Sequence, residues 1–439
     1  MIGGNTNYCP SIGCGTVFRT TRQGTINDVY FTPEVGLYPR SGLLLATDGN
    51  YYGITSDGGS NMNGCYNGSC GTIFLVSPGG KLTNLYSFCA LPDCADGFYP
   101  FGALTEGTDG QLYGTTSQGG SAGGGGTIFK LTTAGALTTL YSFPCQNGCP
   151  EGSQPESQLI QSNDGYFYGT TEFGGNFGCP DFGCGTIFRI SPKGILTTLH
   201  RFNGEDGWDI GGLSQSPDGT LYGTSFLGGD LSCDKPYGCG LLFSINALEG
   251  FNVLHIFEAT DGIGPFGTLT IATDGNIYGT TSGLKNPGVY NDGTIFRITP
   301  SGELTTLHGF NGSDGFDPAG GLFQGTDGKF YGTTADGGNF SCSQGEGQGC
   351  GSIFSLDVGL TPFVIFVQRS ARVNQVAGIL GRGFTGTTSV SFNGTAASFM
   401  VASNTFIKAT VPPGATTGYV TVTTPGGKLT SNVPFHVLP

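Results

Sequence analysis

A segment of about 55 residues repeats along most of this chain, and this repetition constrains the fold more than any other feature. Asp-Gly-x-x-Tyr-Gly, or a close variant, begins at Asp48, Asp109, Asp164, Asp218, Asp274 and Asp327. Gly-Thr-Ile-Phe, or a close variant, begins at Gly15, Gly71, Gly126, Gly185, Gly240, Gly293 and Gly351. A Gly-x-Leu run, or a close variant, precedes each Asp-Gly. The segment Leu-Thr-Thr-Leu-Tyr-Ser-Phe at 137–143 has counterparts at 25–31, 82–88, 196–202, 251–257, 304–310 and 360–366.

Each period therefore predicts four short strands, which is the content of one β-propeller blade. We expect the first strand in the Gly-x-Leu run, the second in x-x-Tyr-Gly-Thr-Thr, the third in Gly-Thr-Ile-Phe and the fourth in the Leu-Tyr-Ser-Phe segment. Asp-Gly favours a tight turn between the first two strands. The links from second to third strand and from fourth to first are long, so both are expected on one face, which we name the long-loop face.

The strand count predicts a seven-bladed propeller with a truncated first blade, over residues 1–366. Seven third strands and seven fourth strands are present, but only six first and second strands. We therefore expect half a blade, and an export signal, upstream of Met1. A six-bladed ring with a spare N-terminal hairpin is the alternative.

The 14 cysteines form close neighbour pairs. Such an even count of close pairs predicts loop-closing disulfides and an oxidising, extracellular or cell-surface location. Structural zinc is the rival interpretation, but it needs four ligands together, and these pairs recur one per repeat. The predicted disulfides are Cys9/Cys14, Cys65/Cys70, Cys89/Cys94, Cys145/Cys149, Cys179/Cys184, Cys233/Cys239 and Cys342/Cys350.

The formal net charge of −14 argues against nucleic acid as a partner, because that role needs clustered Lys and Arg. It also argues against binding to anionic membrane surfaces. No apolar run approaches the ~20 residues of a membrane helix, so no membrane insertion is expected.

Residues 367–439 depart from the repeat and predict an immunoglobulin-like β-sandwich of short alternating strands. Three segments carry a resemblance to the IPT/TIG family: Gly381-Arg382-Gly383-Phe384, Val390-Ser391-Phe392-Asn393-Gly394 and Val411-Pro412-Pro413-Gly414-Ala415. The resemblance implies a spacer or binding module without catalytic groups.

The repeats themselves resemble the Gloeo/Verruco repeat through their Asp-Gly-x-x-Tyr-Gly-Thr-Thr and Leu-Tyr-Ser-Phe segments. That resemblance implies export and tandem repetition in a bacterial surface-associated protein. It transfers no catalytic residue.

Candidate ligand-binding residues lie in the links from fourth to first strand, on the long-loop face. Carboxylates there either cap their loops or surround a ligand, and Trp208, with Phe316 in the corresponding loop, suits sugar stacking. The oxygen-rich loops at 203–209 and 311–317 could hold calcium, but neither has an EF-hand spacing, so no cofactor is predicted. Because His200, His255 and His308 occupy the slot of Tyr86 and Tyr141, they are interpreted as packing residues. The candidates are Asp96, Asp206, Trp208, Asp209, Asp261, Asp314 and Phe316.

These observations favour a non-catalytic extracellular or cell-surface binding or structural protein, with an extracellular polysaccharide or another surface protein as its partner. One alternative is a carbohydrate-active enzyme, a glycosidase or lyase, that uses an acid pair among Asp206, Asp209, Asp261 and Asp314. Another is self-association through the incomplete blade into a filament or matrix.

Overall fold

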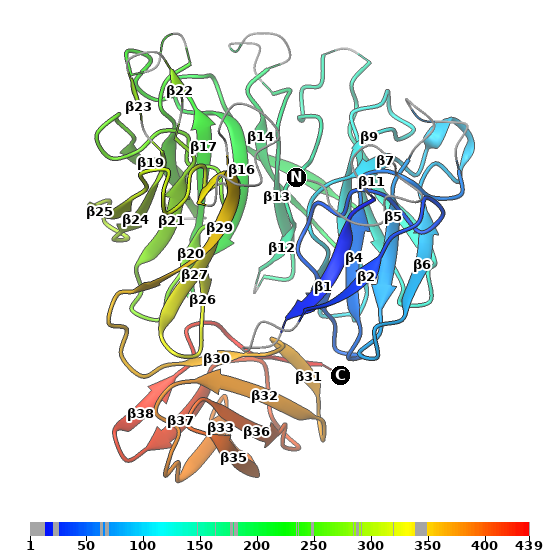
Figure 1. The fold of residues 1–439 in the computed structure, drawn as a ribbon. Helices are drawn as coiled ribbons and strands as arrows, with labels where there is room; N and C mark the ends of the chain where they lie inside the picture. The colour runs from blue at the N-terminus through cyan, green and yellow to red at the C-terminus, as the bar shows by residue number, and fades with distance from the viewer. Residues whose placement is uncertain are drawn as a thin grey trace. The chain divides into compact units, whose positions relative to one another are not determined.

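The computed structural model describes residues 14–20, 26–61, 65, 70–146, 148–162, 164–175, 179, 183–233, 235, 237–246, 250–283, 285–286, 289–290, 292–318, 320–338 and 349–438. The chain divides into two compact units, Met1–Asn203 and Gly204–Pro439. Both consist of small, mainly antiparallel β-sheets (Figure 1). Within the described part, helix is confined to one 3-10 turn, η2 (Pro92–Cys94), and no helix there is long and apolar enough to cross a membrane. The predicted all-β class is confirmed.

Unit 1 contains a hairpin, β1-β2, followed by three repeat sheets, β3-β4-β5-β6, β8-β9-β10-β11 and β12-β13-β14-β15. The short strand β7 also pairs with β9. The strands are β1 (Thr16–Thr20), β2 (Ile26–Tyr30), β3 (Leu44–Leu45), β4 (Tyr51–Thr55), β5 (Thr72–Val76), β6 (Leu82–Ser87), β7 (Phe98–Pro100), β8 (Thr105–Glu106), β9 (Leu112–Gln118), β10 (Thr127–Leu131), β11 (Leu137–Ser142), β12 (Ile160–Gln161), β13 (Phe167–Thr171), β14 (Thr186–Ile190) and β15 (Leu196–Arg201).

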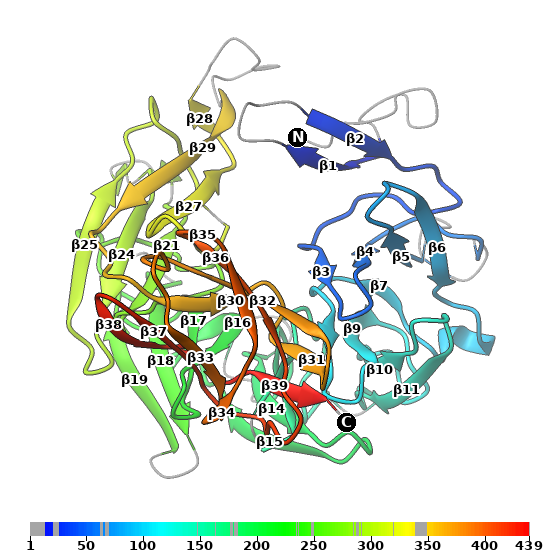
Figure 2. The same cartoon turned by 90° about the horizontal axis from the view of Figure 1, so that it is seen from below.

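Unit 2 continues with the repeat sheets β16-β17-β18-β19, β20-β21-β24-β25 and β26-β27-β29-β28, and with the hairpin β22-β23 (Figure 1). Their strands are β16 (Trp208–Gln215), β17 (Leu221–Leu227), β18 (Leu241–Asn246), β19 (Gly250–Ile256), β20 (Thr270–Ile271), β21 (Ile277–Thr281), β22 (Lys285–Asn286), β23 (Val289–Tyr290), β24 (Thr294–Ile298), β25 (Leu304–Gly309), β26 (Phe323–Gln324), β27 (Lys329–Thr334), β28 (Gly337–Gly338) and β29 (Gly349–Asp357). Strands β16 to β19, β21, β24, β25 and β27 to β29 are also labelled in Figure 2.

The Asp-Gly motif forms the turn between the first two strands of each repeat, as predicted. In the β8–β9 turn, Asp109 Oδ1 accepts the backbone N–H of Gln111 at 3.1 Å. Its other carboxylate oxygen accepts the hydroxyl of Tyr113 at 2.8 Å. The aspartate thus accepts a backbone hydrogen bond inside the turn, and the tyrosine four residues later stabilises the turn by donating a second hydrogen bond to the same carboxylate. The same Asp–Tyr bond joins Asp48 to Tyr52, Asp164 to Tyr168, Asp274 to Tyr278 and Asp327 to Tyr331.

The glycine that ends the motif gives room for a phenylalanine on the next strand. Gly114 on β9 is paired with Phe129 on β10, and a Cβ built at Gly114 would lie 2.6 Å from the Phe129 ring. Any larger residue would therefore displace a fully buried ring. This contact explains why the Tyr-Gly dipeptide and the Ile-Phe dipeptide recur together.

A β-bulge lies at one position of the fourth strand in five repeat sheets. In the β5–β6 pair, Ile73 is opposite Tyr86 but Phe74 is opposite Asn84, so Leu85 is the additional residue. Leu85 and Tyr86 then pack against the same core cluster although they are adjacent in sequence. The corresponding register shifts lie at Ile128/Phe129, Ile187/Phe188, Leu242/Phe243 and Ile295/Phe296.

Hydrophobic clusters join consecutive repeat sheets within each unit. In unit 1 one cluster contains Tyr52 of β4 together with Phe129 of β10. In unit 2 another contains Leu242 of β18 together with Phe296 of β24. Successive sheets therefore pack face to face, which is the packing expected of propeller-like repeats.

The segment 360–366 is not the fourth strand of the last repeat sheet, and that expectation was wrong. Strand β30 (Val364–Phe366) pairs with β32 (Val376–Gly381) in a C-terminal sheet, through Val364↔Gly381 to Phe366↔Ile379. The segment reads Thr361-Pro362-Phe363-Val364, and a proline cannot donate the backbone hydrogen bond that a strand inside a ladder needs.

The C-terminal strands form two sheets, β30-β32-β36-β35 and β34-β33-β37-β38, and a parallel pair, β31-β39. Both sheets contribute to one core that includes Ile379, Val390 and Val422. Within unit 2, Tyr419 donates a hydrogen bond to the Pro217 carbonyl at 3.0 Å. The remaining strands are β31 (Ser370–Arg372), β33 (Ser389–Phe392), β34 (Thr395–Ala396), β35 (Phe399–Ser403), β36 (Phe406–Thr410), β37 (Val420–Thr424), β38 (Gly427–Thr430) and β39 (His436–Leu438).

Candidate functional site

The acid in the β6–β7 loop, Asp96, is held by its own loop and by Tyr86 of the preceding strand β6. Its side chain is fully buried, and its carboxylate accepts the Tyr86 hydroxyl at 2.8 Å. The same carboxylate accepts the backbone N–H groups of Ala90 at 3.0 Å and Leu91 at 3.1 Å. These bonds satisfy the buried charge and fix the loop, so a ligand would reach Asp96 only if the loop opened.

Two corresponding acids in unit 2 make the same bond with histidine in place of tyrosine. Nε2 of His255 lies 2.7 Å from Asp261 Oδ2, and Nε2 of His308 lies 2.9 Å from Asp314 Oδ2. His255 also packs edge-to-face on Phe257, with ring centroids 5.0 Å apart. The interpretation of these histidines as substitutes for a packing aromatic is confirmed, because His255 occupies the register position of Tyr86.

The two remaining loop acids lie in equivalent places. In unit 1, Glu151 accepts a hydrogen bond from the hydroxyl of Tyr141. In unit 2, Asp206 lies half-buried in the loop that precedes β16. The bond from a fourth-strand aromatic to a loop acid is thus a repeated feature of the scaffold at four of the loops.

A strained backbone position, which was not predicted from the sequence, follows these loops. The second residue after the loop glycine adopts a left-handed φ of 52° to 59° in five repeats. Such values are rare for residues other than glycine and persist only where the surroundings impose them. A Gly-x-x-Pro pattern marks most of these sites in the sequence and could have drawn attention to them. The residues are Tyr38, Tyr99, Gln154, Asp209 and Asp317, and Gly264 occupies the position in the sixth repeat.

Backbone hydrogen bonds hold this strained position in place. In unit 2 the N–H of Asp317 donates to the Asp292 carbonyl at 3.2 Å, and the Asp317 carbonyl accepts from Ala335 at 2.9 Å. In unit 1, Gln154 makes the corresponding pair of bonds, with Gly125 and Glu172. The backbone is therefore the same while the side chain differs from repeat to repeat.

Asp209 is the most perturbed acid of the predicted set. Burial alone raises the pKa of Asp209 to about 6. No hydrogen-bond donor from the described residues reaches its carboxylate, in contrast to Asp96. Burial also raises the pKa of Asp317, and the nearby carboxylate of Asp336 adds to the increase. Asp317 was not among the predicted residues, although it aligns with Asp209 and follows the predicted Phe316, which forms a β-bridge with Asp336.

An aromatic pair accompanies Asp209. Trp208 begins β16, and its ring centroid lies 5.8 Å from that of Tyr237. Tyr237 comes from the β17–β18 loop and its side chain is 44% exposed. The structure therefore brings Trp208, Asp209 and Tyr237 into one region of unit 2. It leaves Asp261 and Asp314 bonded to the preceding fourth strand and to backbone N–H groups of their own loops.

Five of the seven predicted disulfides are present with both partners described, which confirms the prediction for these pairs. They are Cys65–Cys70, Cys89–Cys94, Cys145–Cys149, Cys179–Cys184 and Cys233–Cys239.

The other two predicted pairs each include a residue outside the described part of the chain. Cys14 is fully buried and disulfide-bonded, but its predicted partner Cys9 lies outside the described residues. Cys350 belongs to β29, yet its side chain and the whole of Cys342 lie outside them too. Pairing of Cys9 with Cys14 and of Cys342 with Cys350 therefore stays a prediction.

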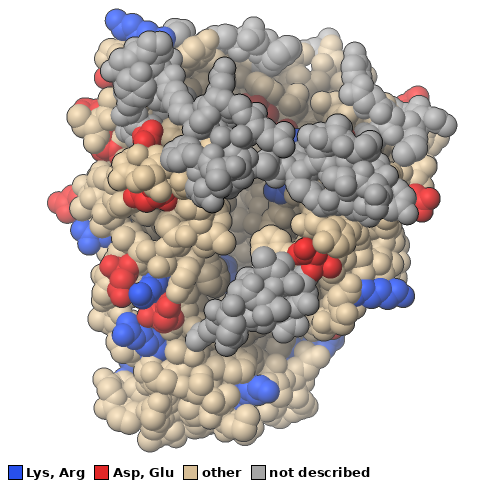
Figure 3. Space-filling view, in the orientation of Figure 1, with Lys and Arg blue, Asp and Glu red and all other residues tan. Residues whose placement is uncertain are grey.

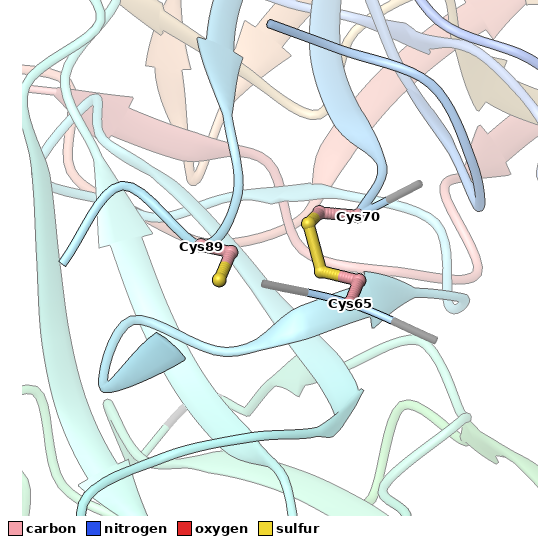
Figure 4. Close-up of side chains that lie close together, drawn as sticks. All are labelled: Cys65, Cys70 and Cys89. Carbon is pink, nitrogen blue, oxygen red and sulfur yellow. A yellow bond between two sulfur atoms is a disulfide. The ribbon is translucent and has the colours of Figure 1, made fainter. Parts of the chain in front are cut away.

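The described residues contain one close group of three candidate metal ligands, the sulfurs of Cys65, Cys70 and Cys89 (Figure 4). All three belong to disulfides, and metal ligation requires thiolates. The group therefore consists of sulfurs from two neighbouring disulfides and does not support the zinc interpretation.

Charged side chains are sparse on the described part of the face drawn in Figure 3. Lys and Arg are scattered there and do not gather into a continuous patch. The absence of nucleic acid as a partner stays a prediction.

Comparison with solved structures shows likeness at the level of the fold. A fungal alcohol oxidase of the AA5 family in complex with copper is 12% identical, with a TM-score of 0.51, over 95% of this chain and 89% of that one. A virginiamycin B lyase from Staphylococcus aureus is 16% identical, with a TM-score of 0.45, over 85% and 94%. A gluconolactonase from Xanthomonas campestris is 13% identical, with a TM-score of 0.40, over 70% and 85%. Of these three, only the alcohol oxidase has a TM-score above 0.5, and at 12% identity it bears on the fold alone and not on activity.

No curated protein matches the sequence. The family described as the Gloeobacter/Verrucomicrobia repeat matches residues 2–232 and 178–399, which together span most of the chain. These matched residues include every Asp-Gly turn and the Gly114–Phe129 contact described above. The chain belongs to the Gloeobacter/Verrucomicrobia repeat family.

Proposed function

We propose that this protein is a non-catalytic, extracellular or cell-surface binding protein that holds a neutral glycan on its long-loop face. Asp209 carries the proposal: its carboxylate is half-buried, lacks a donor from the described residues and sits on a strained backbone. A desolvated carboxylate gains most from a ligand that donates hydrogen bonds, and sugar hydroxyls do so. Trp208 and Tyr237 supply the aromatic surface on which a sugar ring can stack.

The other loop acids favour binding over catalysis. Asp96, Glu151, Asp261 and Asp314 each take part in the same bond with a fourth-strand aromatic. A glycosidase needs two carboxyl groups in different environments, one as acid and one as nucleophile or base. A repeated bond that fixes loops gives these four acids a structural role instead.

We propose further that the repeats close as a propeller of the seven-bladed type, with the C-terminal module as an immunoglobulin-like spacer of the IPT/TIG type. Face-to-face packing of successive sheets supports the first part. Two sheets around one core support the second. The five disulfides are typical of an exported protein.

Incubation with a panel of soluble polysaccharides, with binding and product release followed in the same samples, tests the function. We expect binding without new reducing or unsaturated chain ends, and about tenfold weaker binding by Trp208→Ala. Asp209→Asn should weaken binding too, because it removes the charged acceptor. Asp218→Asn, in a turn between first and second strands, is the matched control. Cleavage of a polysaccharide would contradict the proposal and make Asp206 and Asp209 the first residues to test for catalysis.

A second candidate function, self-assembly, rests on the outer edge of β29. Beyond a short pairing with β28, no described strand pairs with this edge. Ile353 on β29 is 81% exposed, whereas Ile295 at the same position of β24 is 1% exposed under its fourth strand. An open apolar edge of this kind can recruit a strand from a second copy of the chain.

Measuring the molar mass in solution by light scattering tests the assembly hypothesis. It predicts a dimer or larger species that Ile353→Lys converts to monomer, because a charge at this position would be buried on association. A wild-type protein that is monomeric at all concentrations would exclude assembly through β29.

A further inference from the structure

Two neighbouring disulfides in unit 1 bring their sulfur atoms together. The Cys65–Cys70 bridge belongs to the β4–β5 loop, and the Cys89–Cys94 bridge to the β6–β7 loop. The sulfurs of Cys65, Cys70 and Cys89 all lie within 4.8 Å of one another (Figure 4). One bridge therefore presents a sulfur atom directly to the other.

The two bridges differ in backbone strain. Cys89 and Cys94 both adopt left-handed φ values, 58° and 48°, and Asp93 between them does so too, at 56°. Cys65 and Cys70 show no such values. Opening the Cys89–Cys94 loop would release the strain of three residues, whereas opening the other loop would release none from these positions.

The two sulfurs of the Cys65–Cys70 bridge differ in access. Cys70 is 1% exposed, while Cys65 is half-buried and more open to solvent. A small thiolate would thus reach the Cys65 sulfur more readily than the Cys70 sulfur. Attack on Cys65 makes Cys70 the leaving group, and the Cys70 sulfur lies within 4.8 Å of the Cys89 sulfur.

We propose that these two disulfides form a thiol–disulfide exchange site whose substrate is a low-molecular-weight thiol. The thiolate of the small molecule attacks Cys65 Sγ, forms a mixed disulfide there and releases the Cys70 thiolate. Cys70 then attacks Cys89 Sγ, forms a Cys70–Cys89 disulfide and releases the Cys94 thiolate, which takes up a proton. Two disulfides are consumed and two are formed, so no further oxidant or reductant is needed.

The product differs from the starting protein in which loops are joined. The Cys70–Cys89 bond would link the β4–β5 loop to the β6–β7 loop, whereas the original bridges each close one loop. Both loops lie among the long links of the repeat. The exchange would therefore change how that region is cross-linked without altering the sheets beneath it.

Cys65→Ser gives the sharpest test, because it leaves Cys70 as a thiol beside the intact Cys89–Cys94 bridge. Acid quenching, alkylation and peptide mapping would then locate the free thiol. We expect most of it at Cys94, with a Cys70–Cys89 bridge. A free thiol that stays at Cys70 would overturn the proposal.

The matched control is Cys179→Ser, which frees Cys184 in the β13–β14 loop. Among the described residues this pair has no third sulfur within reach, so the free thiol should remain on Cys184. Migration of that thiol would show nonspecific scrambling and would also overturn the proposal.

Wild-type protein incubated with reduced glutathione supplies a measurement that is independent of any variant. Exchange predicts a glutathione adduct at Cys65 together with a Cys70–Cys89 cross-linked peptide, and both should form faster than adducts at the Cys179–Cys184 pair. An adduct at Cys65 without the Cys70–Cys89 peptide would refute the second step.

Discussion

Replacing Asp209 with asparagine should stabilise the protein at neutral pH, and the gain should disappear in acid. Burial raises the pKa of Asp209 to about 6, compared with about 3.9 in an unfolded chain. The folded state therefore binds the proton more tightly than the unfolded state does. Ionisation of Asp209 must then cost folding free energy as the pH rises from about 4 to above 6.

The magnitude follows from the size of this shift. A difference of about two pKa units corresponds to about 3 kcal/mol of unfolding free energy once the group is ionised in both states. Asn is nearly isosteric with Asp and also tolerates a left-handed backbone, so Asp209→Asn removes the charge without adding strain. We expect the variant to be more stable than wild type by up to about 3 kcal/mol at pH 7.5, and by little at pH 4.5.

Trp208 is the single tryptophan of the chain and precedes Asp209, so its fluorescence reports on this region. Urea unfolding, followed by Trp208 fluorescence at both pH values, measures the difference in stability between wild type and Asp209→Asn. A pH titration of the same fluorescence in the folded protein should show a midpoint near pH 6 in wild type and none in the variant. Asp218→Asn serves as a control in which the pH dependence should have the opposite sign, because hydrogen bonds from Ser216 and Thr220 lower the pKa of Asp218. Its stabilising contribution is present at neutral pH and lost as the pH falls. A gap between wild type and Asp209→Asn that is equal at the two pH values would refute the reasoning.

Two further predictions concern the scaffold and use urea unfolding. Asp96→Ala should lower the free energy of unfolding by about 3 kcal/mol, because it leaves the Tyr86 hydroxyl and two backbone N–H groups without their acceptor. Tyr86→Phe should lower it by about 1 kcal/mol. The double variant should lose less than the sum of the two single losses, and strict additivity would show that the pair does not interact. Gly114→Ala should lower the free energy of unfolding by about 1–3 kcal/mol, because its Cβ would meet the Phe129 ring. Gly79→Ala should leave stability unchanged, because the atom nearest to its Cβ would be 3.8 Å away. Equal losses of stability in the two variants would contradict the packing argument.

Local sequence signals predicted the features that depend on neighbouring residues. The Asp-Gly turns, the five described cysteine pairs and the tyrosine slot of His255 could all be recognised, because each is set by a short stretch that recurs in register. The repeats also predicted the four-stranded sheets, since each segment recurs about once per 55 residues. These features needed no knowledge of contacts between distant segments.

Features that depend on pairing between strands were missed. The bulge at Leu85 exists only relative to β5, and nothing in Leu-Tyr-Ser-Phe by itself shows that two adjacent side chains reach the same core. The segment 360–366 retained the apolar pattern of a fourth strand, yet it pairs with β32 because the C-terminal sheet offers a competing edge. Pro362 is the one local sign against a fourth strand there, but the competing edge itself cannot be recognised from the segment alone.

The strained position after each loop separates the parts of the repeat that build the scaffold from the part that is free to specialise. Gly–Phe and Asp–Tyr contacts recur nearly unchanged, because altering one partner would break a buried fit. At the strained position the backbone conformation is kept, but the side chain is aromatic, amide, carboxylate or absent. Folding alone would favour glycine there, since glycine adopts left-handed φ without cost. Asp209 combines this strain with desolvation, so it is the position at which the proposed glycan ligand is best tested.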